Sequence, residues 1–462
     1  MGVGVSNWAL ARAVSLRGQL GVVSGTGIDS VFVRRLQDGD VAGHVRRALE
    51  SFPFPELVTD VLDRYLKAGG RAEGEPYASL PLYRQAVTRA RDRVTMLASY
   101  AEVWLAKEGH DGPVGLNLLT KVQMPNLTTL YGAMLAGVDY VLMGAGIPRE
   151  IPGALDRLAR LDLAAIKLDV EDAARGSSHQ LVFDPADHPL PEAPLKRPFF
   201  LPIISSHSLA TVLAKKATGR VDGFIVEAPV AGGHNAPPRG ELQLNGRGEP
   251  VYGERDTVDL EKLKDLGLPF WLAGGAGSPE KLREARAAGA AGIQVGTLFA
   301  YCDESGFSDE VKEPVRRQAL NGGIDVVTDA VASPTGFPFK VVQAPGTLSD
   351  RILYEQRDRV CDLGYLRNPY QRPDGRLDYR CSAEPVETYV KKGGARQETE
   401  GRKCLCNALF AGIGQGQLRK DGRVEQPLIT SGDEINAIGQ LVGENGTGYT
   451  AADVIDYLLG DA

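Results

Sequence analysis

The chain has no excess of positive charge and no apolar run long enough to cross a membrane. Its 52 lysines and arginines are outnumbered by 59 aspartates and glutamates, and the net charge of −7 argues against nucleic-acid binding. The N-terminal residues lack the charged-then-apolar pattern of a secretory signal. Five unevenly spread cysteines do not form a secreted disulfide framework. We therefore expect a cytoplasmic protein that binds neither nucleic acid nor membrane.

The chain is rich in glycine, with 55 residues, and 43% of it is hydrophobic, which is typical of a globular enzyme. Short apolar runs bounded by glycine or proline predict eight strands, at residues 19–24, 113–118, 138–143, 164–168, 200–205, 223–227, 269–273 and 292–296. Helical patterns separate most of them, at residues 127–136, 150–160, 208–217, 257–265 and 279–288. Eight such units predict an α/β fold, the (β/α)8 TIM barrel, with a doubly wound sheet as the alternative.

Two regions do not follow this repeat. Residues 28–110 lie between the first two predicted strands and contain long helical stretches, including residues 83–107. Residues after 320 are rich in turns and end in a helical pattern at 451–459. We predict a barrel over residues 1–320 with a helical insertion at about 28–110, and a C-terminal extension, residues 321–462, that packs on the barrel.

A glycine pair followed by histidine comes directly after the sixth predicted strand, at Gly232, Gly233 and His234. The C-terminal ends of parallel strands carry the chemistry of barrels and open α/β sheets. Glycines let a ligand touch the backbone there, and histidine titrates near neutral pH. The sequence favours a cofactor site with a base beside it, and a glycine-proline loop with an incidental histidine is the alternative.

Glycines also follow the last two predicted strands, at Gly274, Gly275 and Gly296, the last of which precedes Thr297. Barrel enzymes commonly hold a phosphate between the loops after strands seven and eight, on backbone N–H groups. Each cluster alone is typical of a turn. Two clusters at neighbouring strand ends favour a phosphate site.

Four of the five cysteines fall in the C-terminal extension: Cys361, Cys381, Cys404 and Cys406. Their thiolates could complete a tetrahedral zinc site or an iron–sulfur site. The spacing is wide and lacks CxxC pairs, so four unrelated buried thiols are the alternative. Cys302 is predicted to be a packed thiol.

Several motifs in this order resemble the nitronate monooxygenase family, formerly called 2-nitropropane dioxygenases. They are residues 10–15 with Gly21, and residues 114–118, 144–148, 231–234, 273–275 and 294–297, within a region of roughly 6–347. This family of FMN-dependent barrels includes the flavin-type enoyl-acyl carrier protein reductases. The resemblance implies an FMN-binding TIM barrel.

The resemblance also implies a role for each motif. His234 would transfer a proton or orient the substrate, with His207 as a rival. Lys167, on the fourth predicted strand, would project into the barrel mouth beside the flavin. The other residues implied in cofactor binding are Ser24, Gly25, Thr26, Asn117, Ala231, Gly232, Gly233, Gly274, Gly275, Gln294, Gly296 and Thr297.

The implied activity is oxidation of a small alkyl nitronate with dioxygen. The alternative within the family is NAD(P)H-dependent reduction of an enoyl thioester, with an acyl carrier protein as partner. A flavin-free protein that binds a phosphate ligand is a third hypothesis. Two features depart from the simplest members of the family: residues 235–240, which follow the glycine-histidine motif, and the helical insertion. We expect both to change which substrate is bound more than which cofactor is bound.

Overall fold

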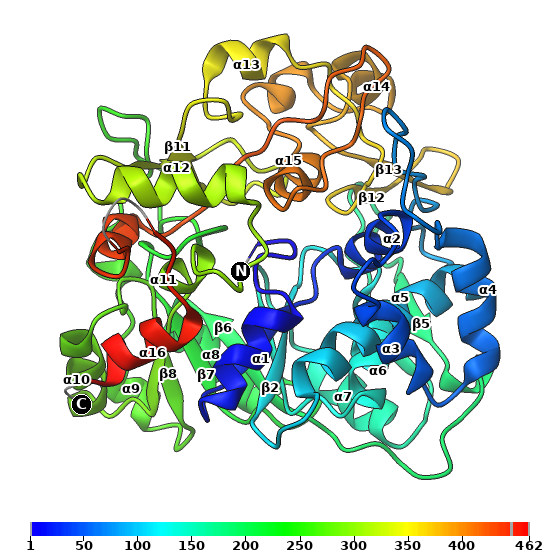
Figure 1. Cartoon of the computed structure of the whole chain (residues 1–462), viewed down its shortest axis with the longest axis horizontal. Helices are drawn as coiled ribbons and strands as arrows, with labels where there is room; N and C mark the ends of the chain where they lie inside the picture. The colour runs from blue at the N-terminus through cyan, green and yellow to red at the C-terminus, as the bar shows by residue number, and fades with distance from the viewer. Residues whose placement is uncertain (1, 444–446, 461–462) are drawn as a thin grey trace.

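The computed structural model describes residues 2–443 and 447–460 and is built around a curled parallel sheet with helices outside it (Figure 1). Seven strands lie in the order β1-β2-β3-β6-β7-β8-β9, and neighbours pair in parallel. Their bounds are β1 Gly21–Ser24, β2 Val114–Leu119, β3 Tyr140–Gly144, β6 Phe199–Ile204, β7 Phe224–Glu227, β8 Phe270–Ala273 and β9 Gly292–Gln294. The predicted α/β fold with a parallel sheet is confirmed.

Alternate residues of each strand face the inside of the curl, because side chains alternate across a sheet. Leu142, Leu201, Ile225 and Ala273 form a buried cluster there, together with half-buried Trp271 and others. On β7 the outward residues join the main hydrophobic core instead. Side chains from neighbouring strands therefore line the inner face of the sheet together.

The fourth predicted strand forms but does not join this sheet. β4 (Ala164–Lys167) pairs antiparallel with β5 (Gln180–Phe183), and β3 pairs directly with β6. A local hairpin partner satisfies the hydrogen-bonding groups of β4, since antiparallel strands need only a short connection. The predicted count of eight barrel strands is therefore wrong: the sheet has seven, with β1 and β9 at its two edges.

Between β1 and β2 lie four helices, α2 Ile28–Gln37, α3 His44–Glu50, α4 Pro55–Tyr65 and α5 Arg89–Lys107. Around the sheet lie α1 Trp8–Leu16, α6 Asn126–Leu135, α7 Ile151–Ala159, α8 His207–Lys216, α9 Leu260–Lys264, α10 Pro279–Ala287, α11 Thr297–Ala300 and α12 Asp309–Ala319. The five helices predicted between strands agree with α6, α7, α8, α9 and α10 to within three residues at each end, whereas the helical stretch predicted at residues 83–107 begins only at Arg89. In the described part of the chain, no helix is long and apolar enough to span a bilayer. The division into domains stays a prediction.

The C-terminal extension forms small elements above the sheet and returns to it (Figure 1). It contains two hairpins, β10 Asp325–Asp329 with β11 Phe339–Gln343 and β12 Asn368–Gln371 with β13 Leu377–Arg380. Its helices are α13 Arg351–Gln356, α14 Val386–Lys391, α15 Leu405–Gly412, the 3-10 helix η4 Asp433–Gln440 and α16 Ala451–Leu459. Shorter 3-10 turns are η1 Pro185–Asp187, η2 Glu254–Asp256 and η3 Arg396–Thr399. α16 packs against α1 and α10, so the end of the extension lies against the barrel helices.

Candidate functional site

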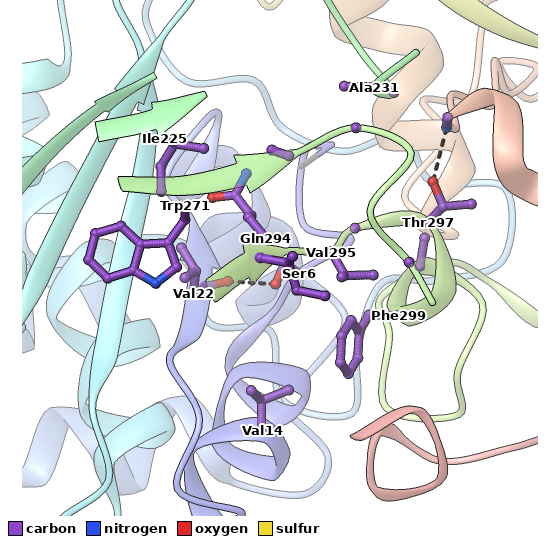
Figure 2. Close-up of a pocket in the computed structure, with 18 of the residues that line it drawn as sticks. Ser6, Val14, Val22, Ile225, Ala231, Trp271, Gln294, Val295, Thr297 and Phe299 are labelled. Atoms are coloured by element: carbon purple, nitrogen blue, oxygen red, sulfur yellow. Dashed lines mark hydrogen bonds between the residues drawn. The ribbon is translucent and has the colours of Figure 1, made fainter. Parts of the chain in front are cut away.

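A cavity of about 390 Å³ lies inside the curled sheet and reaches the C-terminal ends of β7, β8 and β9 (Figure 2). This volume is within the range of small-molecule sites. Inner-face side chains such as Val22, Ile225 and Trp271 form its apolar part. Its lining includes these predicted cofactor-binding residues: Ala231, Gly232, Gly233, Gly274, Gln294, Gly296 and Thr297.

The glycines after β8 have conformations that disfavour other residues. Gly274 and Gly275 have φ of +81° and +68°. A Cβ at Gly274 would lie 3.0 Å from the Ala228 carbonyl oxygen, and one at Gly275 would lie 3.1 Å from a methyl group of Val230. The backbone here can be approached closely only because side chains are absent.

An acidic side chain already lies on this glycine backbone. Glu434, which comes from the C-terminal extension, lies close to the Gly275 backbone, and its Oε2 is buried without a hydrogen-bond partner. Burial raises the pKa of Glu434. A phosphate at the predicted position would lie next to this carboxyl group.

The C-terminal extension supplies one wall of the cavity. The Gly432 N–H donates to Thr297 Oγ1 at 3.0 Å (Figure 2), and the Gly233 N–H donates to Thr430 Oγ1 at 2.8 Å. A Cβ at Gly232 would lie 2.8 Å from the Ser431 backbone, so the two segments are in close contact. The sequence analysis missed this wall, since residues 430–434 carry no recognisable motif and lie far along the chain from Thr297.

The predicted residues of the first two strands lie at and just beyond the C-terminal end of β1 and within β2. Ser24 pairs with Asn117 in register, and both are buried. Ser24 Oγ has no hydrogen-bond partner, as expected of a donor that awaits a ligand. A Cβ at Gly25 would lie 2.5 Å from Leu118, and Thr26 follows this glycine. These four residues are not among those that line the cavity.

His234 lies beside the cavity but its ring turns away from it. Its Nε2 is 2.7 Å from Ser333 Oγ, and its ring packs edge-on against Phe339 with centroids 4.8 Å apart. The backbone of Asn235 donates to the Pro338 carbonyl, which fixes this orientation. Burial lowers the pKa of His234 to about 4, so the ring is neutral at pH 7. Its role in proton transfer stays a prediction.

The other two candidates lie in different places. His207 is the first residue of α8, and its Nδ1 is buried without a partner. Lys167 is exposed on the β4–β5 hairpin, where its ammonium group is 3.4 Å from an oxygen of Asp169. The expectation that Lys167 projects into the barrel mouth is wrong, because β4 pairs outside the main sheet.

The four tail cysteines do come together. Cys361, Cys381, Cys404 and Cys406 pack with Ala383 around a cavity of only about 10 Å³. Burial and the neighbouring cysteines raise the pKa values of Cys404 and Cys406. Within residues 2–443 and 447–460, no three His, Cys, Asp or Glu side chains are placed to hold a metal ion. The predicted metal therefore stays a prediction that needs these thiols to reorient.

A carboxyl group that the sequence analysis did not select lies at the cavity edge. Glu227 is the last residue of β7 and shares the inner face with Ile225, two residues earlier. It lines both the inner cavity and a wider one of about 850 Å³ on the other side. Its position two residues after an inward apolar residue, at a strand end, was a signal available in the sequence.

Part of the chain matches a known protein family. Residues 183–332 match the family model of nitronate monooxygenase. The matched region includes β6 to β9 and both groups of glycines at the cavity, and the predicted family resemblance is confirmed.

Individual relatives are more distant. The (3aS,4S,5R,7aS)-5-hydroxy-7a-methyl-1-oxo-octahydro-1H-indene-4-carboxyl-CoA dehydrogenase of Mycobacterium tuberculosis (strain ATCC 25618 / H37Rv) is 32% identical over 143 residues. This match covers 30% of the chain and 35% of the relative, so the chain matches about a third of that enzyme's length.

Two of the solved structures that resemble this chain have low sequence identity to it. FabK from Thermotoga maritima is 14% identical, with a TM-score of 0.47 over 99% of this chain and 88% of FabK. A nitroalkane oxidase from Streptomyces ansochromogenes is 15% identical, with a TM-score of 0.47 over 100% of this chain and 93% of that one.

Proposed function

We propose that the protein is an FMN-dependent oxidoreductase. The observation that carries this proposal is the inner cavity, onto which two glycine-rich strand ends open side by side at the C-terminal edge of the sheet. Such an edge suits a monophosphate. No GxGxxG motif followed by an acidic residue is present to bind an adenosine, which favours FMN over a dinucleotide.

The residues at the cavity fit this cofactor. The backbone at Gly274 and Gly296, which line the cavity, and at the neighbouring Gly275 would hold the phosphate, with the Thr297 hydroxyl nearby. Gly232 and Gly233 leave room for the flavin ring. The unpartnered Ser24 hydroxyl lies outside the cavity lining, and it would donate to the flavin only if the cofactor extended beyond this cavity toward β1. The flavin supplies the electron transfer, and the protein supplies position and excludes water.

As substrate we propose an alkyl nitronate, oxidised with dioxygen to a carbonyl compound and nitrite. The family domain supports this reaction. In this proposal His234 orients the substrate or transfers a proton, which requires its ring to leave Ser333 Oγ and turn toward the cavity.

A second candidate is the NAD(P)H-dependent reduction of an enoyl thioester, with an acyl carrier protein as the carrier. The observation that favours it is the outer cavity of about 850 Å³, which shares Glu227 and Gly274 with the inner cavity. The two cavities together offer room for an extended acyl thioester, more than a small nitronate needs.

The experiment begins with the visible spectrum of the purified protein. A yellow protein with the two bands of oxidised flavin is expected, and a colourless protein that takes up no added FMN would contradict the flavin proposal. Anaerobic addition of NADH, NADPH or propyl nitronate, followed by oxygen, then separates the two reactions. Flavin reduction or radical formation by the nitronate is expected, whereas rapid reduction by a pyridine nucleotide without nitronate turnover would favour the second candidate.

A further inference from the structure

Glu227 occupies the place in the sheet where a side chain can reach a bound substrate. It ends β7 on the inner face, level with Ala273 of β8, which is itself paired with Gln294 of β9. Ile225, two residues earlier in β7, lies on the same face and packs in the apolar cluster inside the sheet. The carboxyl group of Glu227 is therefore the acidic group carried by β7 where the inner cavity opens.

This carboxyl group has no partner to hold it. Among the described residues no hydrogen bond or ion pair to the Glu227 side chain is found, in contrast to Glu102, which binds Arg35. A carboxyl in such surroundings favours its neutral, protonated form. Loss of hydration on burial raises the pKa of Glu227 to about 7. Both protonation states are thus accessible near neutral pH.

Two further cavities meet at the same side chain. The outer cavity of about 850 Å³ is lined by exposed residues such as Glu254 as well as by Tyr252 and Lys340, and a small one of about 20 Å³ is lined by Glu227 and Arg239. A proton given up by Glu227 toward the inner cavity can be replaced by water from the outer side. A group placed between a closed site and solvent suits repeated proton transfer.

We propose that Glu227 donates the proton that completes the reduction of an enoyl thioester in the inner cavity. This inference rests on the proposed flavin function and deepens its second candidate. In the step, the carbon–carbon double bond becomes a single bond. One carbon receives a hydride from the reduced flavin, which a pyridine nucleotide has reduced beforehand, and the other receives the proton of Glu227. The resulting carboxylate then regains a proton from water in the outer cavity.

Other charged and titratable groups face the same cavities and contribute to any pH profile. They are Glu434 and Arg286 at the inner cavity, Tyr252, Asp256 and Arg239 at the small one, and Arg247, Glu249, Glu254, Lys340 and Asp433 at the outer one. Lys340 is paired with Asp433 at 2.6 Å and Arg247 with Asp325 at 2.8 Å. Among these acids and Glu227, only Glu227 lines both the inner and the outer cavity.

The test compares Glu227→Gln with Glu310→Gln, a control at an exposed residue of α12 that lines none of these three cavities. Each protein is loaded with FMN, reduced anaerobically with NADPH, and mixed with crotonyl N-acetylcysteamine. We expect Glu227→Gln to keep FMN and its reduction by NADPH, but to slow reoxidation by the thioester roughly 10²–10⁴-fold, the usual range for a positioned acid. The control should match the parent.

A measurement without turnover accompanies it. The infrared difference between parent and Glu227→Gln at neutral pH should contain the band of a protonated carboxylic acid, and this band should disappear above the pKa. Parent-like reoxidation by Glu227→Gln, or a parent that holds reduced FMN but does not pass electrons to the thioester, would overturn the inference and leave the flavin proposal standing. A protein that binds no FMN would overturn both.

Discussion

The inner cavity and the cysteine cluster are both assembled from separate segments of the chain, but they differ in the space that they leave for a ligand. The inner cavity is about 390 Å³ and contains unpartnered polar atoms at its edges, such as Glu434 Oε2. The cysteine cluster encloses only about 10 Å³, and its Cys404 thiol donates to the Val360 carbonyl. An open polar cavity indicates a ligand, whereas a closed cluster of thiols is stable by packing alone.

The largest effect is expected at the glycine backbone after β8, next to the inner cavity. Gly275→Leu should abolish flavin retention without unfolding the sheet, because the added side chain blocks access to the backbone N–H and meets Val230. The measurement is the flavin-to-protein absorbance ratio after gel filtration.

Gly346→Leu is the matched control for this change. Gly346 also has a positive φ, +74°, but a Cβ there meets nothing within 4 Å. The control therefore introduces similar backbone strain at a position that does not lie next to the cavity. Equal flavin loss in both variants would show that strain, rather than a blocked site, is responsible.

A smaller effect is expected at His234, which lies beside the cavity. His234→Asn should keep FMN bound and lower turnover with propyl nitronate roughly 10²–10⁴-fold, as for loss of a positioned acid–base group. Steady-state rates at saturating flavin measure it. If His234→Asn is as active as the parent while His207→Asn is inactive, the catalytic histidine has been assigned wrongly.

At Glu434 we expect an effect on binding of roughly fivefold, the size of one charge interaction of about 1 kcal/mol. Its carboxylate would compete with a phosphate for the space beside Gly275, so Glu434→Gln should tighten FMN binding at pH 8. Because burial raises the pKa of Glu434, its charge is lost as the pH falls, and FMN should bind the parent more tightly at low pH. Quenching of flavin fluorescence measures both, and an affinity unchanged by pH and by the substitution would contradict the competition.

The smallest effect on the flavin is expected from the cysteine cluster. If the thiols reorient, elemental analysis of anaerobically purified protein should find about one zinc, or several irons, per chain. Cys404→Ser should then lose this metal but keep the flavin spectrum. If the parent protein contains no metal and four thiols of the extension can be titrated, the cysteine cluster has only a packing role.

Much of the sheet could be predicted because its strands are buried on both faces and appear as apolar runs, as at Phe224 and Ile225. The glycines of the cavity were predictable for a related reason, since they follow such runs directly. Lys167 was placed wrongly because an apolar run does not reveal which strand it pairs with. The wall near Thr430 could not be predicted, because contacts between distant segments depend on the folded structure.

The wall contributed by residues 430–434 also has a consequence for biosynthesis. The ribosome releases β1 to β9 well before this segment, which follows Thr297 by more than a hundred residues and closes over it through the Gly432 N–H. A nascent chain therefore carries the sheet and its glycines but lacks one side of the cavity. If FMN binds in this cavity as proposed, it can be held only after the extension has been translated and has docked on the sheet.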